Sequence, residues 1–221
     1  MRKLLTTVSL ALLLAGCRQE ASFQGKSVTQ WRAELKDRDP EVRYAAAAAL
    51  GNIGAKAGAA VPDLTEALKD PNDMVRARVV TTLWSLGSAA KDTVPDLIAA
   101  LQDKNAEVRL NAAGALGSLG SSGDEAVGPL AAAVKDKDAK VRAAAAKALG
   151  KFGSRGKDAV PALTAALKDQ INEVRIAAAN TLAAIGPEAT SAVPVLTKMS
   201  EEKDGGVRGA ALLALRQKKE R

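Results

Sequence analysis

The chain has 221 residues, of which 47% are hydrophobic and 26% charged, and its formal net charge is +7 at pH 7. This composition supports a folded core, and because only 2% of the residues are aromatic and alanine dominates the apolar fraction, it favours closely packed helices over a β-sandwich or barrel. The absence of histidine excludes Ser–His–Asp and Cys–His triads, His-ligated zinc or iron sites, and a histidine pH switch.

The N-terminal segment has the layout of a secretory signal. Residues 1–3 are basic, residues 4–14 are mostly apolar, and small residues follow at Ala15 and Gly16. This apolar run is too short for a membrane-spanning helix, which needs about 20 residues. We therefore expect residues 1–16 to be a signal peptide that is removed.

The end of this signal, Leu14-Ala15-Gly16-Cys17, resembles the lipobox of bacterial lipoproteins. The resemblance implies that Cys17 is acylated and becomes the first residue of the mature chain, followed by a polar tether, so that residues 17–27 form the lipidated anchor. The alternative is an ordinary signal peptide with a chance cysteine. Because Cys17 is the only cysteine, no disulfide is expected. The expected location is outside the cytoplasm, anchored by lipid to the cell membrane or outer membrane and facing the periplasm.

The remainder of the chain is a repeat of constant length. Three columns of residues recur every 33 positions in six copies without an insertion. They are Val28, Val61, Val94, Val127, Val160 and Val193; Val42, Val75, Val108, Val141, Val174 and Val207; and Leu50, Leu83, Leu116, Leu149, Leu182 and Leu215. The pattern predicts one repeat domain over residues 28–221, divided into repeats 28–60, 61–93, 94–126, 127–159, 160–192 and 193–221.

Each repeat predicts two helices. In the second repeat, apolar residues at i, i+3 and i+7 mark the first helix at Val61, Leu64 and Leu68. A second helix is marked by Val75, Val79, Leu83 and Leu86, and it ends at Gly87 because a helix C-terminus favours a residue that tolerates positive φ. The expected N-caps of the second helices are Asp39, Asn72, Asn105 and Asp138.

The sequence motif of the first repeat resembles the bacterial HEAT-like repeat, which also occurs in phycobilisome lyases. The resemblance is carried by Asp39-Pro40-Glu41-Val42-Arg43 and by Ala49-Leu50-Gly51-Asn52-Ile53-Gly54. It implies an all-α fold, an α-solenoid (superhelix) of six HEAT-like helix pairs. Physical reasoning agrees, because a pair of helices this short cannot bury both apolar stripes without neighbours. The open first layer is expected to be covered by Phe23 and Trp31.

Arginine and aspartate also recur once in each repeat. The columns are Arg43, Arg76, Arg109, Arg142, Arg175 and Arg208, and Asp37, Asp70, Asp103, Asp136 and Asp169. A fixed offset between one cation and one anion predicts structural pairs between neighbouring repeats rather than catalytic carboxylates. We therefore predict no catalytic residue, no metal site and no cofactor.

The positions that vary between repeats are the candidate binding residues, because a repeat keeps its core and frees its surface. In HEAT-like solenoids the second helices line the concave side, so the resemblance places the variable columns of those helices there. The candidates for binding a partner are Tyr44, Leu110 and Ile176 as exposed apolar contacts, with Arg78 and Lys147 as charged flanks. An ordinary solvated face with scattered apolar residues is the alternative.

Trp84 departs from its column, in which four of the other five residues are glycine or alanine. It either fills a gap between repeats or serves as an exposed anchor for a partner.

The predicted function is a membrane-anchored protein–protein interaction scaffold of the bacterial cell envelope, binding a protein or peptide on the concave face. The alternative is a lyase-like or nucleic-acid-acting HEAT-like enzyme or accessory factor. Nucleic acid is not favoured, because lysines alternate with acidic residues and only five aromatic side chains are available for stacking on bases. The sequence leaves the oligomeric state open.

Overall fold

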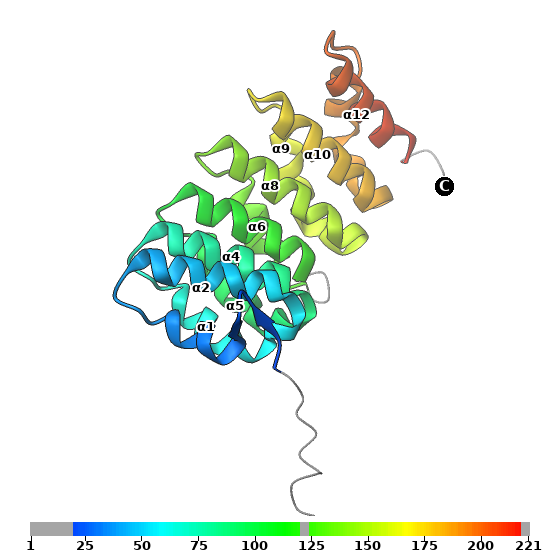
Figure 1. Cartoon of the computed structure of the whole chain (residues 1–221). Helices are drawn as coiled ribbons and strands as arrows, with labels where there is room; N and C mark the ends of the chain where they lie inside the picture. The colour runs from blue at the N-terminus through cyan, green and yellow to red at the C-terminus, as the bar shows by residue number, and fades with distance from the viewer. Residues whose placement is uncertain (1–19, 120–123, 218–221) are drawn as a thin grey trace, which may run out of the picture.

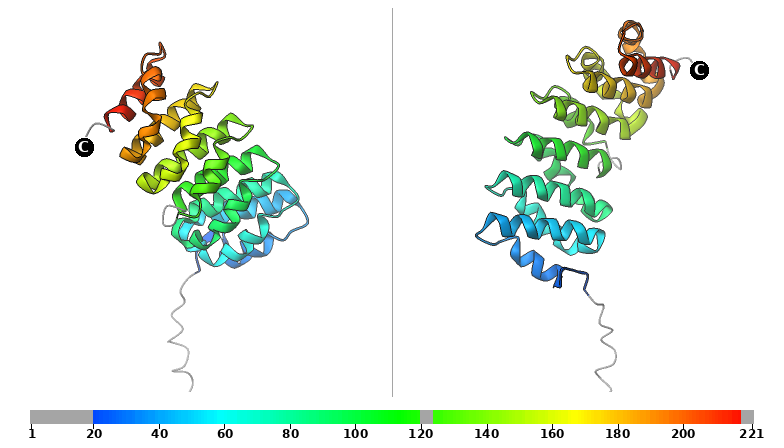
Figure 2. Two further views of the ribbon diagram at one scale, coloured as in Figure 1. Left: turned by 180° about the vertical axis from the view of Figure 1, so that it is seen from behind. Right: turned by 45° about the horizontal axis from the view of Figure 1, so that its top comes forward.

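A computed structural model describes residues 20–119 and 124–217 of the chain. Helices alternate between two layers, and the pairs stack along one axis (Figure 1; Figure 2). The first helices of the pairs are α1 (Val28–Glu34), α3 (Val61–Ala67), α5 (Val94–Ala100), α7 (Val127–Ala133), α9 (Val160–Ala166) and α11 (Val193–Met199). The second helices are α2 (Pro40–Ile53), α4 (Asp73–Leu86), α6 (Ala106–Leu119), α8 (Ala139–Leu149), α10 (Asn172–Ile185) and α12 (Gly205–Arg216). The predicted all-α solenoid of six helix pairs is confirmed.

Short 3₁₀ helices, rather than irregular loops, connect most pairs. A glycine with positive φ stands where the chain leaves the second helix, for example Gly87 at φ +58°. Most first helices have a proline at their start, such as Pro62 in α3. Proline is tolerated there because the N–H group that it lacks would have no partner within the helix. The connectors are η1 (Gly54–Ala60), η2 (Gly87–Thr93), η4 (Gly150–Ala159) and η5 (Gly186–Ala192).

The segment before the first helix is folded, which corrects part of the predicted tether. Strands β1 (Ser22–Phe23) and β2 (Lys26–Ser27) form an antiparallel hairpin. The indole Nε1 of Trp31 donates to the carbonyl oxygen of Phe23 at 3.2 Å, and Trp31 is only 5% exposed. The hairpin therefore packs on the first repeat from residue 20 onwards, while Cys17 and the predicted signal peptide lie outside the described residues.

The predicted N-caps of the second helices are confirmed. The side chain of Asp39 accepts a hydrogen bond from the backbone N–H of Glu41 at 2.9 Å, and Asn72, Asn105 and Asp138 make the equivalent bonds. In the fifth repeat the same position is Ile171, which has extended backbone angles, no side-chain cap and 44% exposure. Helix α10 therefore begins without the hydrogen bond that the other second helices receive.

Ile171→Asp should raise the free energy of unfolding by about 1 kcal/mol, because the carboxylate would supply the missing cap at a backbone position that already has N-cap geometry. Urea unfolding followed by circular dichroism measures the change. Ile171→Ala is the matched control, since it removes the same exposed side chain without adding an acceptor. Equal stability of the two variants would contradict the prediction.

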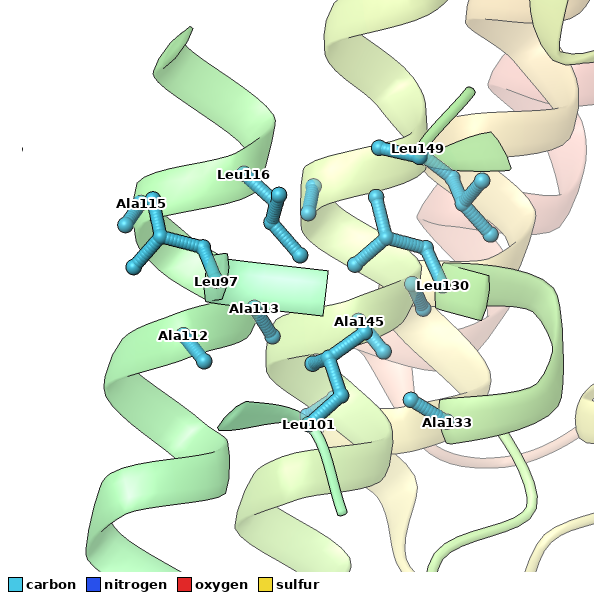
Figure 3. Packing of buried hydrophobic residues seen from close by; sticks show 14 of the residues in the cluster. Leu97, Leu101, Ala112, Ala113, Ala115, Leu116, Leu130, Ala133, Ala145 and Leu149 are labelled. Atoms are coloured by element: carbon cyan, nitrogen blue, oxygen red, sulfur yellow. The ribbon is translucent and has the colours of Figure 1, made fainter. Parts of the chain in front are cut away.

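The core lies between the two helical layers and continues through the stack. Leucines of the first helices, such as Leu97 and Leu130, point toward leucines of the second helices, such as Leu116 and Leu149 (Figure 3). Successive second helices pack directly on one another, whereas successive first helices make few contacts. The second helices therefore form the more closely spaced, inner side of the stack.

Small residues permit this close spacing of the second helices. A Cβ atom added to Gly117 on α6 would lie 2.9 Å from the Cα of Ala148 on α8, which is closer than such atoms approach one another. The alanines of the neighbouring columns are buried for the same reason, among them Ala46, Ala112, Ala145 and Ala178. An alanine-rich composition thus follows from the short distance between neighbouring helices.

The C-terminal end of the stack is open within the described part of the chain. Leu212 of α12 is 44% exposed, although the residues at the same position of the five preceding repeats are fully buried. Those residues are Ala47, Val80, Ala113, Ala146 and Ala179. Each is covered by the repeat that follows, and no described repeat follows α12.

Candidate functional site: the inner groove of the second helices

The arginine and aspartate columns form pairs between neighbouring repeats, as predicted. Arg76 donates from Nε and Nη2 to the two carboxylate oxygens of Asp103 at 2.8 and 2.9 Å, and from Nη1 to the carbonyl oxygen of Asp70 at 2.8 Å. The same arrangement recurs between Arg43 and Asp70, Arg109 and Asp136, and Arg142 and Asp169, each pair 27 residues apart. In the fifth repeat Arg175 pairs with Glu202.

The aspartates of these pairs, Asp70, Asp103, Asp136 and Asp169, all have a pKa lowered below the ordinary value, which favours the ionised form. Burial by itself would raise the pKa of Asp103, but hydrogen bonds from Arg76 and from the backbone N–H of Asn105, together with the guanidinium charge, lower the pKa below its ordinary value. A general acid at neutral pH needs a raised pKa, so the column is unsuited to that role. Its contacts are those of a structural connection between repeats.

Within residues 20–119 and 124–217, no group of three acidic, cysteine or histidine side chains is placed to hold a metal ion. Within the same ranges, no helix is both long enough and apolar enough to cross a membrane.

Three hollows lie in a row along the second helices, and we call this row the inner groove. The first, of about 110 Å³, is lined by Tyr44, Met74, Ala77, Arg78, Thr81, Glu107 and Asn111. The central hollow, of about 370 Å³, is lined by Trp84, Leu110, Asn111, Gly114, Gly117, Ser118, Ala144, Lys147, Ala148 and Lys151. The third, of about 560 Å³, is lined by Lys147, Gly150, Lys151, Glu173, Ile176, Ala177, Asn180 and Thr181.

Adjacent hollows share lining residues, so the inner groove is continuous across the first to fifth repeats. Asn111 lines the first and central hollows, and Lys147 lines the central and third. All five residues predicted to bind a partner line this row: Tyr44, Arg78, Leu110, Lys147 and Ile176. Tyr44, Leu110 and Ile176 occupy one column of the 33-residue repeat, so the stacking of the second helices brings them to one face, and Arg78 and Lys147 stand one and four positions later in the same frame.

Arg78 lines the first hollow as a charged residue, and Tyr44 holds it in place. Its guanidinium carbon lies 4.6 Å from the centroid of the Tyr44 ring, and its Nη2 donates to the Tyr44 hydroxyl. This stacking holds both side chains against the groove floor, and the Arg78 Nε is buried without a hydrogen-bond partner in the described part of the chain. The pair forms a fixed wall of the first hollow.

The three apolar candidates are half-buried, so the expectation that they are freely exposed is wrong. Tyr44 and Ile176 pack partly against the core, and Leu110 is likewise only partly accessible. Lys147 is exposed and pairs with Glu173 at 2.6 Å, with side-chain exposures of 59% and 61%. An ion pair this exposed contributes little to stability, so Lys147 can exchange Glu173 for another anion.

Trp84 fills a gap between repeats, the first of the two roles considered for it, and is also partly exposed. Its ring lies against Gly114 of the next repeat, where an added Cβ would approach the ring to 3.0 Å, and its Nε1 donates to the hydroxyl of Ser118 at 3.0 Å. It therefore fills the gap between α4 and α6. It is nevertheless 41% exposed, because it also forms a wall of the central hollow.

Sequence reasoning missed the residue that accommodates Trp84. Gly114 is the only glycine in its column, which otherwise holds Ala48, Thr81, Lys147, Asn180 and Leu213. The sequence signal for this contact is a glycine in a column without other glycines, 30 residues after the tryptophan that departs from its own column.

The arrangement of the helices defines the class of protein. It is an α-solenoid of stacked helix pairs with a continuous groove on its inner layer. The profile of the family of HEAT repeats matches residues 28–91, 61–135 and 127–216, and the chain belongs to this family. No protein of curated function matches the sequence.

Several solved structures share the fold. An engineered protein from the Northeast Structural Genomics Consortium is 26% identical with a TM-score of 0.71, and the match covers 87% of this chain and 96% of that one. The complex of CpcE and CpcF of phycocyanin lyase from Nostoc sp. PCC7120 is 26% identical with a TM-score of 0.63, covering 85% and 75%. A computationally designed armadillo repeat protein for modular peptide recognition is 20% identical with a TM-score of 0.66, covering 86% and 99%, and at this identity the likeness concerns the fold alone.

Proposed function

We propose that this protein is a non-enzymatic scaffold of the bacterial cell envelope, anchored by lipid at Cys17, that holds a protein or peptide segment in the inner groove. Solenoids of this fold are typical of protein-interaction scaffolds. The observation that carries the proposal is the continuity of the three hollows, which join all five candidate residues in one row.

A binding role fits the chemistry of the groove better than a catalytic one. The recurrent carboxylates are engaged by arginines of the preceding repeats, and the central hollow is walled mainly by apolar and small side chains. The structure of phycocyanin lyase from Nostoc is itself a complex of two chains, CpcE and CpcF. This likeness supports a protein as the partner. No feature of the described residues favours the lyase-like or nucleic-acid-acting alternative.

Lipid attachment has a direct test. Metabolic labelling with a fatty-acid analogue should tag the wild-type protein and leave Cys17→Ser unlabelled, because Cys17 is the only thiol in the chain. The variant should also move from the membrane fraction to the soluble fraction of disrupted cells. Labelling that persists in Cys17→Ser, or an unlabelled wild type, would reject the anchor and leave the groove unaffected.

Partner binding is tested with a photo-crosslinking amino acid placed at Leu110 in intact cells, followed by identification of the captured chain. The same amino acid at Lys135, an exposed position outside the inner groove, is the control. The proposal requires a partner that is captured from the groove position and not from Lys135. Equal capture from both positions would contradict it.

Truncation of the apolar candidates should weaken binding of that partner. Leu110→Ala and Ile176→Ala are each expected to cost more than about 2 kcal/mol of binding free energy, because anchors in a hollow contribute most of an interface's affinity. Their half-burial predicts a stability loss of about 1 kcal/mol, measurable by urea unfolding. Tyr44→Ala should weaken binding as well by releasing Arg78 from the groove wall. Unchanged affinity in all three variants would refute binding in the inner groove.

A further inference from the structure

The fourth repeat presents a row of three lysines, of which Lys147 and Lys151 line the inner groove. Lys140, Lys147 and Lys151 follow one another at i, i+7 and i+11, which is one face of α8 and its continuation into η4. All three are exposed. Among residues 20–119 and 124–217, Lys140 and Lys151 have no ion-pair partner, and Lys147 has only its exposed pair with Glu173.

Two of these lysines stand between hollows with apolar walls. Lys147 and Lys151 line both the central and the third hollow. On one side of them lie Trp84 and Leu110, and on the other side lies Ile176. A ligand that crosses this part of the groove therefore meets an apolar surface, then two ammonium groups, then a second apolar surface.

The charge of the groove changes along its length. The first hollow carries Glu107 together with Arg78, and Arg78 is already occupied by Tyr44. The formal charges of the first hollow therefore cancel, while two lysines against Glu173 alone leave the region between the central and third hollows positive. A bound segment with separated apolar and acidic parts would be oriented by this difference.

We propose that the segment held in the inner groove is an acidic peptide with a large apolar side chain next to its carboxylates. This inference rests on the proposed function. The apolar side chain enters the central hollow against Trp84, and one or two carboxylates bind Lys147 and Lys151. An extended chain advances about 3.3 Å per residue and its successive side chains point to opposite sides, so a carboxylate two residues from the apolar side chain can reach the lysines while that side chain fills the hollow. The carboxylate of Glu173 is replaced on Lys147 at little cost because that pair is exposed.

The test begins with selection of binders from a random library of linear nonapeptides, displayed on phage, against the purified full-length chain. The expected result is enrichment of sequences that combine phenylalanine, tryptophan or leucine with aspartate or glutamate two residues away. The leading peptide is then synthesised with a fluorescent label, and its affinity is measured by anisotropy beside two altered forms. In one form every acidic residue is replaced by its amide, and in the other the large apolar residue is replaced by alanine.

The lysines are tested with a charge reversal. Lys147→Glu/Lys151→Glu should weaken binding of the acidic peptide by at least about tenfold, remove its dependence on salt, and favour a peptide in which lysine replaces the acidic residues. Lys135→Glu/Lys137→Glu changes the net charge equally outside the inner groove and should leave binding unchanged. Both double variants should unfold at the wild-type temperature, because the changed side chains are exposed.

The possible outcomes separate the inference from the function on which it rests. Enrichment of neutral or basic peptides whose binding depends on Leu110 but not on Lys147 and Lys151 would overturn the acidic ligand and retain the peptide-binding groove. Binding that no substitution in the inner groove alters would overturn both. Loss of acidic-peptide binding in both double variants alike would show a non-specific charge effect and would likewise overturn the inference.

Discussion

Arg109→Ala is expected to lower the free energy of unfolding by about 3–5 kcal/mol, the usual cost of removing one partner from a buried ion pair. The Arg109 guanidinium is buried and donates to both carboxylate oxygens of Asp136, at 2.7 and 2.9 Å. It also binds the carbonyl oxygens of Asp103 and Lys104. The substitution therefore leaves a largely buried carboxylate and two carbonyl groups without their donor. Urea unfolding followed by circular dichroism measures the loss.

The last repeat provides the control for this substitution. Arg208 occupies the same column and binds the corresponding carbonyl groups, but it is exposed and has no carboxylate partner in the described part of the chain. Arg208→Ala should therefore change stability by only about 0.5 kcal/mol. If Arg109→Ala lowers the free energy of unfolding no more than Arg208→Ala does, the arginine–aspartate pairs do not stabilise the contact between repeats.

Leu130→Ala should lower the free energy of unfolding by about 2–5 kcal/mol, because it removes a fully buried side chain and leaves a cavity. Leu130 lies in the middle of the stack, where it points toward the core between α6 and α8 (Figure 3). Repeats of a solenoid are stabilised by their nearest neighbours, so a weak central repeat should also separate the unfolding of the two halves. We expect thermal unfolding to broaden or to show two transitions.

Leu213→Ala is the control for the loss of leucine itself. Leu213 is 47% exposed on α12, so its truncation removes little buried surface and should cost about 0.5 kcal/mol. A single sharp transition with an unchanged midpoint in Leu130→Ala would be inconsistent with a continuous core held by neighbouring repeats.

The inner groove was only partly predictable from the sequence. The column containing Tyr44, Leu110 and Ile176 was identified because it varies while the core columns do not, and the stacking of equivalent helices places it on one face. Their half-burial could not be read in the same way, because exposure depends on the distance to the next helix. That distance is set by contacts such as Gly117 against Ala148, which lie on different repeats.

The sequence by itself determined the repeat length, the two helices of each repeat, their caps and the pairing of arginine with aspartate. These features follow from local rules: apolar periodicity defines a helix, a short polar side chain caps it, and a fixed offset brings opposite charges together in every copy. The missing cap at Ile171 is visible in the same way, as a break in a column.

Phe23 and Trp31 cover the first repeat as expected, but only the tertiary structure showed the hairpin that brings them together and the shape of the central hollow. The hairpin before α1 depends on the contact of Trp31 with Phe23. It lies outside the repeats, so the repeat pattern does not predict it. The central hollow depends on the fit of Trp84 over Gly114, residues on successive helices that meet only when the repeats stack. Local rules act within a helix and its ends, whereas these contacts arise between repeats and depend on side-chain volumes.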